Sequence, residues 1–227
     1  MCRMILAAGK VELGPLIDGL IRMAADINER HELNVKPYRH GDGWGIAYVK
    51  DGKWKVVKSV KPCYYDSDID KLRKVKTTLA VLHARKASFG MPISMENTHP
   101  FQNGRWVFCH NGSVWDKLDV NHRAKGNTDS ERLFYTMLQP MKKGKELEAI
   151  TGSIDKLRRF TGLNVILASP DKAFAVIRFN RDEKYYTMKI GQKDGLTVVS
   201  SETLRGAGMK WKPMANGDIV ELNIRKE

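Results

Sequence analysis

Hydrophobic and polar residues follow two different spacings along the chain, and each spacing predicts its own kind of element. Residues 4–8 form a short apolar run typical of a buried strand, and from Pro15 to Ile27 apolar residues recur at helical spacing. Asp51-Gly52 separates two strand-like segments, 45–49 and 53–60, which is a strong hairpin signal. Further strands are predicted at residues 79–83, 105–110, 163–168, 172–179, 185–190, 196–200 and 218–222.

Helical segments stand between these groups of strands. Residues 67–76 predict a short charged helix, and Thr128 with Glu131 fits a capping box that begins a helix from Ser130 to Leu138. A second helical pattern covers about 144–160. Because no linker, repeat or low-complexity tract interrupts the chain, we expect one α+β domain over residues 1–227 with two antiparallel sheets.

The chain is basic, since 39 Lys and Arg residues against 26 Asp and Glu residues give it a formal charge of +13. A basic protein can bind nucleic acid. Here the lysines are spread over the whole chain, without an arginine-rich arm or zinc-finger spacing. We therefore interpret the charge as solvated surface and predict no nucleic-acid partner, while a basic binding protein without enzymatic activity stays open as an alternative.

The sequence lacks several features that would indicate a membrane, an export route, a metal or a cofactor. No apolar run approaches the ~20 residues of a membrane-spanning helix, and the N-terminal apolar run is too short for a signal peptide. With only three cysteines, this predicts a cytoplasmic protein that has no disulfide framework and does not associate with membranes. Zinc-ligand spacing and phosphate-binding glycine motifs are both missing, so we expect neither a metal nor a cofactor.

Cys2 is the first candidate for chemistry. Removal of Met1 would leave a cysteine with a free α-amine, whose pKa is about 7.7–8.0 in model peptides. Such an amine can take the thiol proton, so one residue would supply both nucleophile and base. From its position alone, Cys2 is better interpreted as a small apolar residue that starts a strand.

Several short motifs offer complementary chemistry. Arg85 ends an apolar strand with a guanidinium suited to a carboxylate, although an ordinary strand-end arginine fits as well. Asn111-Gly112 places an amide side chain beside a glycine N–H, and two such donors can hold an oxyanion; the alternative is a plain turn like Asn103-Gly104. Asp129 lies in a first helical turn, where a carboxylate is also favoured for structural reasons alone.

Taken together and in chain order, these motifs resemble those of the class II glutamine amidotransferases, a branch of the N-terminal nucleophile hydrolases. The matching segments are Met1-Cys2, His40 to Gly45, His83-Ala84-Arg85, Glu96 to Phe101, His110-Asn111-Gly112 and Thr128-Asp129-Ser130-Glu131. The chain resembles a small single-domain subgroup of this family in two segments, Asp-Gly-Trp-Gly and Glu-Asn-Thr-His-Pro-Phe. That subgroup contains the YafJ-type proteins and γ-glutamyl hydrolases.

The resemblance implies a fold and a set of roles. The fold is a four-layer αββα sandwich of two antiparallel sheets between helical layers. Cys2, after loss of Met1, would attack the side-chain amide of glutamine or of a γ-glutamyl compound, with its α-amine as base. Asn111 and the Gly112 N–H would form the oxyanion hole. The substrate-binding residues implied are Arg85 for the α-carboxylate, Asp129 for the α-ammonium, and Ser88 and His99 for further contacts.

The chain also departs from the family's fused members. Lys86 follows Arg85 where many of them have tryptophan, and Phe89 stands where they often have histidine, so contacts around the headgroup are expected to differ. Two enzymatic hypotheses remain: a glutaminase that passes ammonia to a separate synthase, and a free-standing γ-glutamyl amide hydrolase without such a partner.

Overall fold

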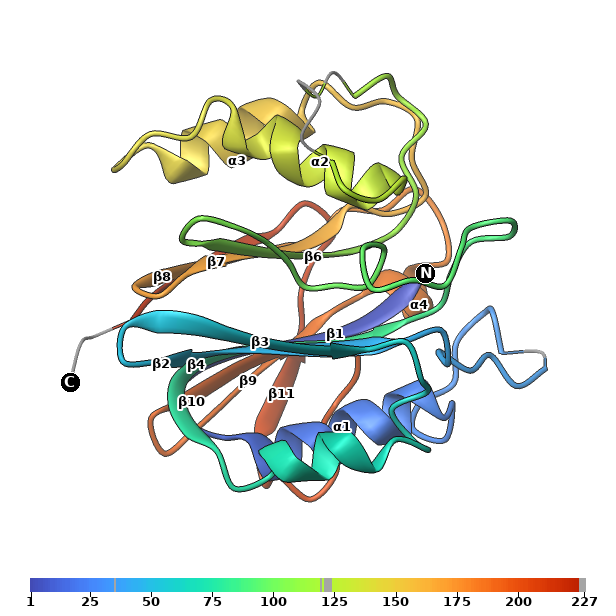
Figure 1. Ribbon diagram of the computed structural model, residues 1–227, viewed down its shortest axis with the longest axis vertical. Coiled ribbons are helices and arrows are strands. Elements are labelled where there is room, and N and C mark those ends of the chain that lie inside the picture. The colour runs from blue at the N-terminus through green and yellow to red at the C-terminus, as the bar shows by residue number, and fades with distance from the viewer. Residues whose placement is uncertain (35, 119, 121–123, 225–227) are drawn as a thin grey trace.

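Two antiparallel sheets lie face to face between helical layers in the computed structural model (Figure 1), which describes residues 1–34, 36–118, 120 and 124–224. Helix α1 (Leu13–Ala24) and the short 3₁₀ helix η1 (Ser67–Leu72) cover the outer face of one sheet. Helices α2 (Asp129–Leu138) and α3 (Glu146–Ile154) cover the other. This order of layers is the predicted αββα sandwich.

The larger sheet has seven strands in the order β11-β9-β10-β1-β4-β2-β3. Its strands are β1 (Cys2–Glu12), β2 (Trp44–Lys50), β3 (Lys53–Ser59), β4 (Lys76–Arg85), β9 (Lys189–Lys193), β10 (Leu196–Ser200) and β11 (Lys210–Pro213). Strand β1 lies in the middle, paired with β4 on one side and β10 on the other. The N-terminal residues are therefore held on both sides.

The smaller sheet has five strands in the order β12-β8-β7-β6-β5. Its strands are β5 (Phe101–Asn103), β6 (Trp106–Asn111), β7 (Asn164–Ser169), β8 (Lys172–Val176) and β12 (Ile219–Asn223). β2 and β3 turn at the predicted Asp51-Gly52, whereas the β5–β6 hairpin turns at Gly104-Arg105, one residue later than the predicted Asn103-Gly104. Asp51 and Gly52 both have positive φ, at 52° and 69°, which matches the twist of paired strands.

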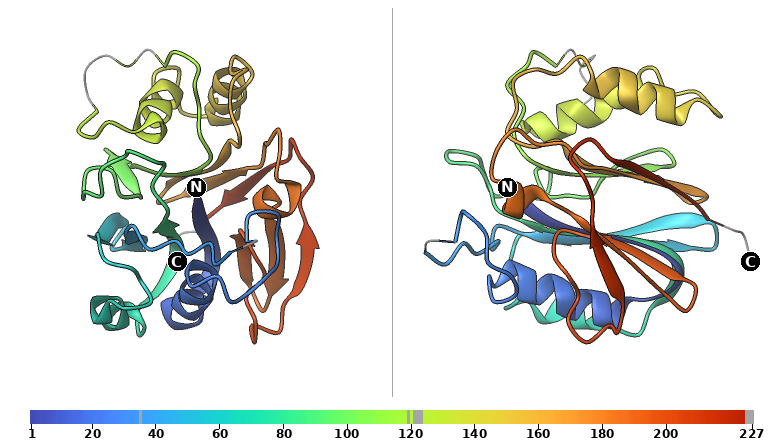
Figure 2. Two further views of the ribbon diagram at one scale, coloured as in Figure 1. Left: turned by 90° about the vertical axis from the view of Figure 1, so that its right-hand side faces the viewer. Right: turned by 180° about the vertical axis from the view of Figure 1, so that it is seen from behind.

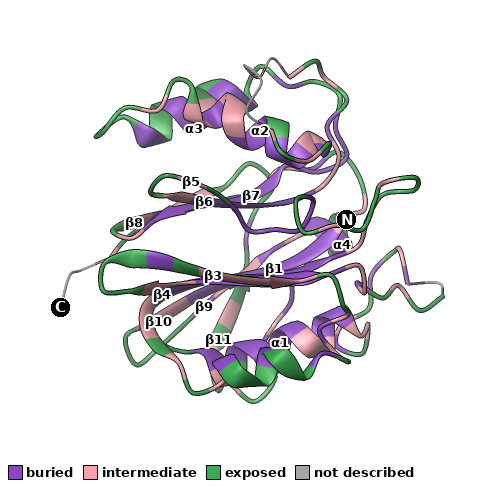
Figure 3. Ribbon diagram, in the orientation of Figure 1, coloured by how far each residue is buried: buried purple, intermediate pink, exposed green. Residues whose placement is uncertain are grey.

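Three apolar layers hold the sandwich together, and Figure 3 shows the buried residues concentrated in the central strands. Strand β1 feeds two of these layers, because successive side chains on a strand point to opposite faces. Met4 and Leu6 pack between the sheets, whereas Ile5 and Ala7 pack under α1. A strand covered on both faces reads as a continuous apolar run, which explains the pattern of residues 4–8.

Helix α2 begins as its sequence predicts. The Thr128 hydroxyl accepts a hydrogen bond from the Glu131 N–H at 3.1 Å. The Glu131 carboxylate accepts hydrogen bonds from the N–H groups of Lys125 and Gly126. It therefore stabilises the loop before α2 instead of bonding the Thr128 N–H, as a capping box would require.

Several predicted elements were wrong in type or extent. Residues 185–190 are not one strand: the short helix α4 (Glu183–Tyr186) starts after Asp182, whose φ is 53°, and β9 begins only at Lys189. Helix α1 ends at Ala24 because Asp26 adopts a φ of 61°, and Ile27 is 59% exposed. The helix expected over 144–160 ends at Ile154, and η1 stops four residues before the end of its predicted range, 67–76. None of the helices in the described ranges is long and apolar enough to cross a membrane.

Candidate active site

Three predicted site residues meet where β1 begins and β4 and β6 end, at the edge shown facing the viewer in the left panel of Figure 2. Cys2 is the register partner of Arg85 across the β1–β4 ladder. Asn111, the last residue of β6, comes from the other sheet. The pairing of strands and the packing of the two sheets thus bring together residues that are far apart in the sequence.

Asn111 contacts Cys2 directly. The Cys2 backbone N–H donates to the Asn111 side-chain oxygen at 2.6 Å. Asn111 is fully buried, and its Nδ2 has no hydrogen-bond partner among the described residues. A buried N–H group without a partner is energetically costly, so this donor points to a role with a ligand.

Gly112 is a position that only glycine can occupy. Its φ is 153°, and a Cβ atom built there would lie 1.8 Å from the carbonyl oxygen of Gly162. The neighbouring His110 ring is held between the Ser130 hydroxyl, at 2.9 Å, and the same Gly162 carbonyl, at 3.1 Å. These contacts fix the backbone that carries Asn111 and the Gly112 N–H.

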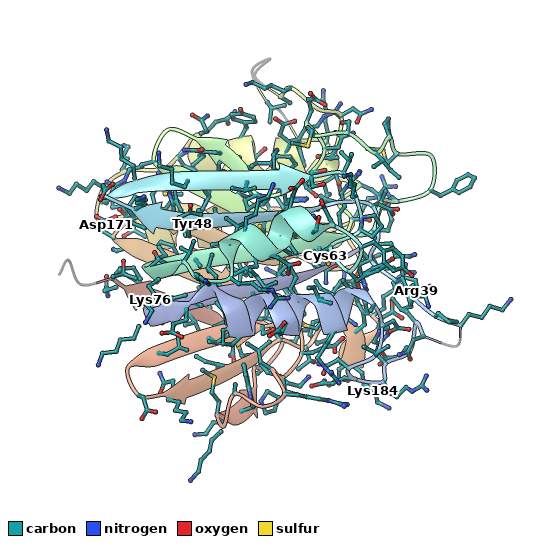
Figure 4. The ribbon with its side chains drawn as sticks, turned by 60° about the horizontal axis from the view of Figure 1, so that its bottom comes forward. Arg39, Tyr48, Cys63, Lys76, Asp171 and Lys184 are labelled. Carbon is teal, nitrogen blue, oxygen red and sulfur yellow. The ribbon has the colours of Figure 1, made fainter. Side chains whose placement is uncertain are left out.

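The thiol of Cys2 is electrostatically distinct from the other two thiols. Burial by itself raises its pKa, but His83, the N-terminal ammonium and hydrogen bonds from His83 and the Lys86 backbone lower the pKa to about 6. Burial raises the pKa of Cys63 to about 12 and that of Cys109 well above its usual range. Cys63, labelled in Figure 4, packs in the layer under α1. Since the thiolate is the nucleophilic form, the lowered pKa makes Cys2 the candidate nucleophile among the three cysteines.

Arg85 carries a buried charge without a counter-ion among the described residues. Its Nη1 and Nη2 both donate to the Pro92 carbonyl at 3.1 Å, and it is only 4% exposed. A carbonyl does not neutralise a guanidinium, and buried charges are usually paired. An external carboxylate would neutralise this charge.

Asp129 accepts backbone hydrogen bonds at the start of α2 with both of its carboxylate oxygens. One carboxylate oxygen accepts the Val114 N–H at 2.7 Å, and the other accepts the Ser130 N–H at 2.9 Å. It is half-buried at the start of α2, where the helix dipole favours a carboxylate. Each oxygen keeps a lone pair, so binding of an ammonium group remains compatible with these bonds.

The remaining predicted contacts differ in their surroundings. Ser88 lies in the exposed loop after β4, and its carbonyl accepts the Met91 N–H at 3.0 Å. His99 is buried, and its ring packs at a tilt against His83, at a centroid distance of 4.3 Å, and against Phe101, also at 4.3 Å. Within the described part of the chain, no three His, Cys, Asp or Glu side chains are placed to hold a metal ion.

Sequence reasoning missed Tyr185, which reaches the nucleophile from α4. Its hydroxyl donates to the Cys2 carbonyl at 3.1 Å and lies 3.0 Å from Nε2 of His40. The Arg3 guanidinium stacks over the Tyr185 ring at 4.2 Å and pairs with Glu202 at 2.8 Å. No local signal marks Tyr185, because it lies in a segment that reads as a strand.

Met1 occupies the position just beyond the nucleophile. Its α-ammonium donates to the Lys86 carbonyl at 2.7 Å, and its carbonyl accepts the Lys86 N–H at 3.0 Å. The Tyr186 hydroxyl lies 3.0 Å from the Met1 sulfur. The α-amine in this form thus belongs to Met1, and Cys2 has an ordinary peptide N–H.

Comparison with known proteins identifies the same family that the sequence motifs resemble. The family described as glutamine amidotransferases class-II matches residues 32–176. The Escherichia coli (strain K12) protein named "Putative glutamine amidotransferase YafJ" is 36% identical over 112 residues, which cover 45% of this chain and 43% of that protein. A protein named gamma-glutamyl-hercynylcysteine sulfoxide hydrolase, from Mycolicibacterium smegmatis, is 31% identical over 115 residues, 49% of this chain and 48% of that one. The matched regions thus span less than half of these relatives.

Solved structures share the fold at low sequence identity. The glutamine phosphoribosylpyrophosphate amidotransferase of B. subtilis, 17% identical, superposes with a TM-score of 0.69 over 98% of this chain and 47% of its own. A glutamine aminotransferase class-II domain protein from Silicibacter pomeroyi, 18% identical, gives a TM-score of 0.64 over 98% of this chain and 95% of its own. The four-layer arrangement is common to all three.

Proposed function

Because the chain belongs to the class II glutamine amidotransferases, we propose that it hydrolyses the side-chain amide of glutamine, or of another γ-glutamyl compound, through a thioester on Cys2. The observation that carries this proposal is the contact between Cys2 and Asn111. It sets a thiol of low pKa beside a buried amide donor that has no partner among the described residues. Acyl transfer needs these two groups, a nucleophile and a pre-placed donor for the oxyanion.

The proposed reaction begins with attack of the Cys2 sulfur on the δ-carbonyl carbon. The carbonyl oxygen becomes negative and receives hydrogen bonds from Asn111 Nδ2 and the Gly112 N–H. The α-amine of Cys2, as base, takes the thiol proton and returns it to the leaving nitrogen when the C–N bond breaks. Water then hydrolyses the thioester, which releases glutamate and regenerates the thiol.

This scheme requires removal of Met1, because only then does Cys2 carry the α-amine. Loss of Met1 also frees the Lys86 carbonyl and N–H that Met1 now engages. We expect the chain that retains Met1 to be inactive toward amides.

The substrate headgroup would be held by opposite charges. Arg85 supplies a buried guanidinium without a counter-ion in the described structure, suited to the α-carboxylate, and Asp129 has lone pairs for the α-ammonium. An amino-acid headgroup needs one cation and one anion in its pocket. Ser88 and His99 stay predictions as further substrate contacts.

Two versions of this function differ in the fate of the leaving group. In the first, ammonia from glutamine passes to a separate synthase. In the second, the protein acts alone on a small γ-glutamyl amide, and the similarity to a protein named as a γ-glutamyl hydrolase favours this version. A panel of γ-glutamyl amides separates them: preference for a substituted amide over glutamine supports the hydrolase, and preference for glutamine supports the glutaminase.

The proposal is tested by following glutamate release from the processed protein. Cys2→Ala should abolish release, whereas Cys63→Ala should retain it, because Cys63 lies in the layer under α1. Equal turnover in Cys2→Ala would overturn the proposal and leave the alternative of a basic binding protein. We also propose that the protein works in the cytoplasm, since its three cysteines are free.

A further inference from the structure

The first residue of β1 has a neighbouring strand on one side only within the described structure. Strand β1 pairs with β4 from Cys2 onward, but its pairing with β10 begins at Ile5. Successive residues of an antiparallel strand send their N–H and C=O groups to opposite sides. Met1 bonds to Lys86 on the β4 side, so Cys2 directs its own N–H and carbonyl to the other side, beyond the end of β10.

Two side chains bind these backbone groups in place of a strand. The Asn111 side-chain oxygen accepts the Cys2 N–H at 2.6 Å, and the Tyr185 hydroxyl donates to the Cys2 carbonyl at 3.1 Å. Asn111 belongs to the five-stranded sheet and Tyr185 to α4, which lies beside the N-terminus in Figure 1. Because both polar groups of Cys2 are held, its backbone torsion is fixed, and with it the direction of the bond that carries the sulfur.

His40 completes this arrangement by donating to the Tyr185 hydroxyl. A carbonyl only accepts, so the hydroxyl proton is committed to Cys2, and the contact of 3.0 Å with His40 Nε2 runs from the imidazole to the hydroxyl oxygen. Burial lowers the pKa of His40 well below its usual range, so its ring is neutral with a single N–H. Its Nδ1 has no partner among the described residues, which agrees with a proton on Nε2.

The rest of Tyr185 is held independently of its hydroxyl. Its ring lies under the Arg3 guanidinium at 4.2 Å, and its carbonyl accepts a hydrogen bond from Arg3 at 3.2 Å. Its N–H donates to the Glu32 carboxylate at 3.1 Å. A phenylalanine would keep the buried ring and both backbone bonds, so packing of α4 does not require the hydroxyl.

Removal of Met1 makes the two bonds to the nucleophile more important. Met1 holds this end of the sheet through two backbone bonds with Lys86. Without them, the terminal residue is held by Asn111 at its amine and by Tyr185 at its carbonyl. The amine and the sulfur are the reacting groups of the proposed scheme, and a misplacement of about 1 Å can cost about 10²-fold in rate.

We propose that Tyr185 is a positioning residue for the nucleophile, whose hydroxyl, oriented by His40, fixes the Cys2 carbonyl and thereby the directions of the α-amine and the sulfur. This inference rests on the proposed function and adds a residue that acts on Cys2 without touching the substrate. Its loss should therefore slow the chemical step and leave substrate binding unchanged.

Steady-state glutamate release from the processed protein tests this role. Tyr185→Phe removes only the hydroxyl and should lower kcat about tenfold, which is within the effect of one lost hydrogen bond, with KM unchanged. Tyr48→Phe is the matched control, because Tyr48 (Figure 4) packs against the layer under α1 and pairs with Ala80, far along the sheet from Cys2. It should change neither constant. A folded Tyr185→Phe protein with wild-type kcat, or with a loss confined to KM, would overturn the inference.

His40 provides a second pair of variants that leave Tyr185 intact. His40→Leu removes the donor to the hydroxyl and should lower kcat with KM unchanged, whereas His40→Gln can still donate from its amide and should recover most of that loss. In the Tyr185→Phe background, His40→Leu should add no further loss in kcat, because His40 acts through the hydroxyl. Losses that multiply in the double variant would refute this order of contacts.

The Cys2 carbonyl gives a readout that needs no turnover. In protein with ¹³C-labelled cysteine carbonyls, the NMR signal of Cys2 is assigned by its loss in Cys2→Ala. It should shift in Tyr185→Phe and stay in place in Tyr48→Phe. An unmoved signal in Tyr185→Phe would refute the inference even where glutamate is released. A shifted signal in a protein that releases no glutamate would support the contact and count against the proposed function alone.

Discussion

The side-chain oxygen of Asn111 accepts a hydrogen bond from the backbone N–H of Cys2 at 2.6 Å. This bond joins the last residue of β6, in the five-stranded sheet, to the first residue of β1, in the seven-stranded sheet. Because the oxygen is committed to Cys2, the amide nitrogen must point elsewhere. That nitrogen is buried and has no partner in the described structure. The orientation of one amide thus follows from the position of the nucleophile.

Replacing Asn111 should therefore affect the transition state more than substrate binding. The amide would stabilise an oxygen that becomes negative only during reaction, and loss of such a donor costs about 10²–10³ in kcat. Asn111→Ala should fall in that range with little change in KM. Asn111→Asp should be worse, because a carboxylate can still accept the Cys2 N–H but repels the oxyanion. Steady-state kinetics of the processed protein measures both effects.

Asn103→Asp provides the matched control, because Asn103 is the last residue of β5, next to the β5–β6 turn. Thermal melting checks the fold of each variant. Aspartate suits tight turns as well as asparagine does. A folded Asn111→Asp protein with near-normal turnover would mean that Asn111-Gly112 is only a turn.

Arg85→Ala should raise KM far more than it lowers kcat. The guanidinium would bind a carboxylate remote from the reacting carbonyl, so its contact is similar in the ground state and the transition state. Loss of one partner from a buried ion pair costs about 3–5 kcal/mol, or about 10²–10³ in KM. Arg105→Ala removes an exposed ion pair with Asp171 and should change neither constant. A loss confined to kcat would contradict a headgroup role for Arg85.

Two glycine substitutions should have opposite effects. Gly112→Ala would place a methyl group 1.8 Å from the Gly162 carbonyl oxygen, so the backbone must move, and both the melting temperature and turnover should fall. Gly152 lies exposed within α3, and a methyl group added there would meet no atom of the described residues within 4 Å. Gly152→Ala should therefore raise stability by about 0.5–1 kcal/mol. Calorimetry measures the melting temperature of each variant, and glutamate release measures turnover. A Gly112→Ala protein with wild-type melting temperature and turnover would show that the close approach to Gly162 is dispensable.

Buried histidines should make the fold sensitive to mild acid. Burial lowers the pKa of His31 to about 4 and that of His40 well below its usual range, whereas an unfolded histidine titrates near about 6.5. Below that value the unfolded chain binds protons that the folded protein does not. Stability is therefore fully present above about pH 6.5 and is lost as the pH falls toward the folded pKa.

Melting temperatures between pH 7.5 and pH 5 measure this effect, and Cys2→Ala serves as the background because it removes the titration of the thiol. Carboxylates such as Glu29, whose folded pKa is lowered, stabilise the fold above their unfolded pKa of 4.5. That stabilisation is lost only at more acidic pH, below the range of this measurement. His40→Gln should flatten the slope over this range. A melting temperature independent of pH in the Cys2→Ala protein would contradict the buried neutral histidines.

Short-range signals in the sequence predicted much of the local structure. The Asp51-Gly52 hairpin, the Thr128 cap and the apolar strand at residues 4–8 each depend on a few adjacent residues and are confirmed, and the turn predicted at Asn103-Gly104 forms one residue later. The segment around Tyr185 was misread for the same reason. Its Tyr-rich sequence favours a strand, but the backbone turns at Asp182 and both tyrosines are buried by tertiary packing.

What the sequence by itself determined was the layered fold that the motifs imply, and it named Cys2, Arg85, Asn111 and Asp129 as candidate site residues. The tertiary structure decided which of them touch. Cys2 and Asn111 are 109 residues apart and belong to different sheets, and Arg85 lies beside Cys2 only through the β1–β4 register. Ladder register and sheet packing are long-range contacts whose partners no local pattern specifies. The burial that sets each pKa likewise exists only once the layers have closed.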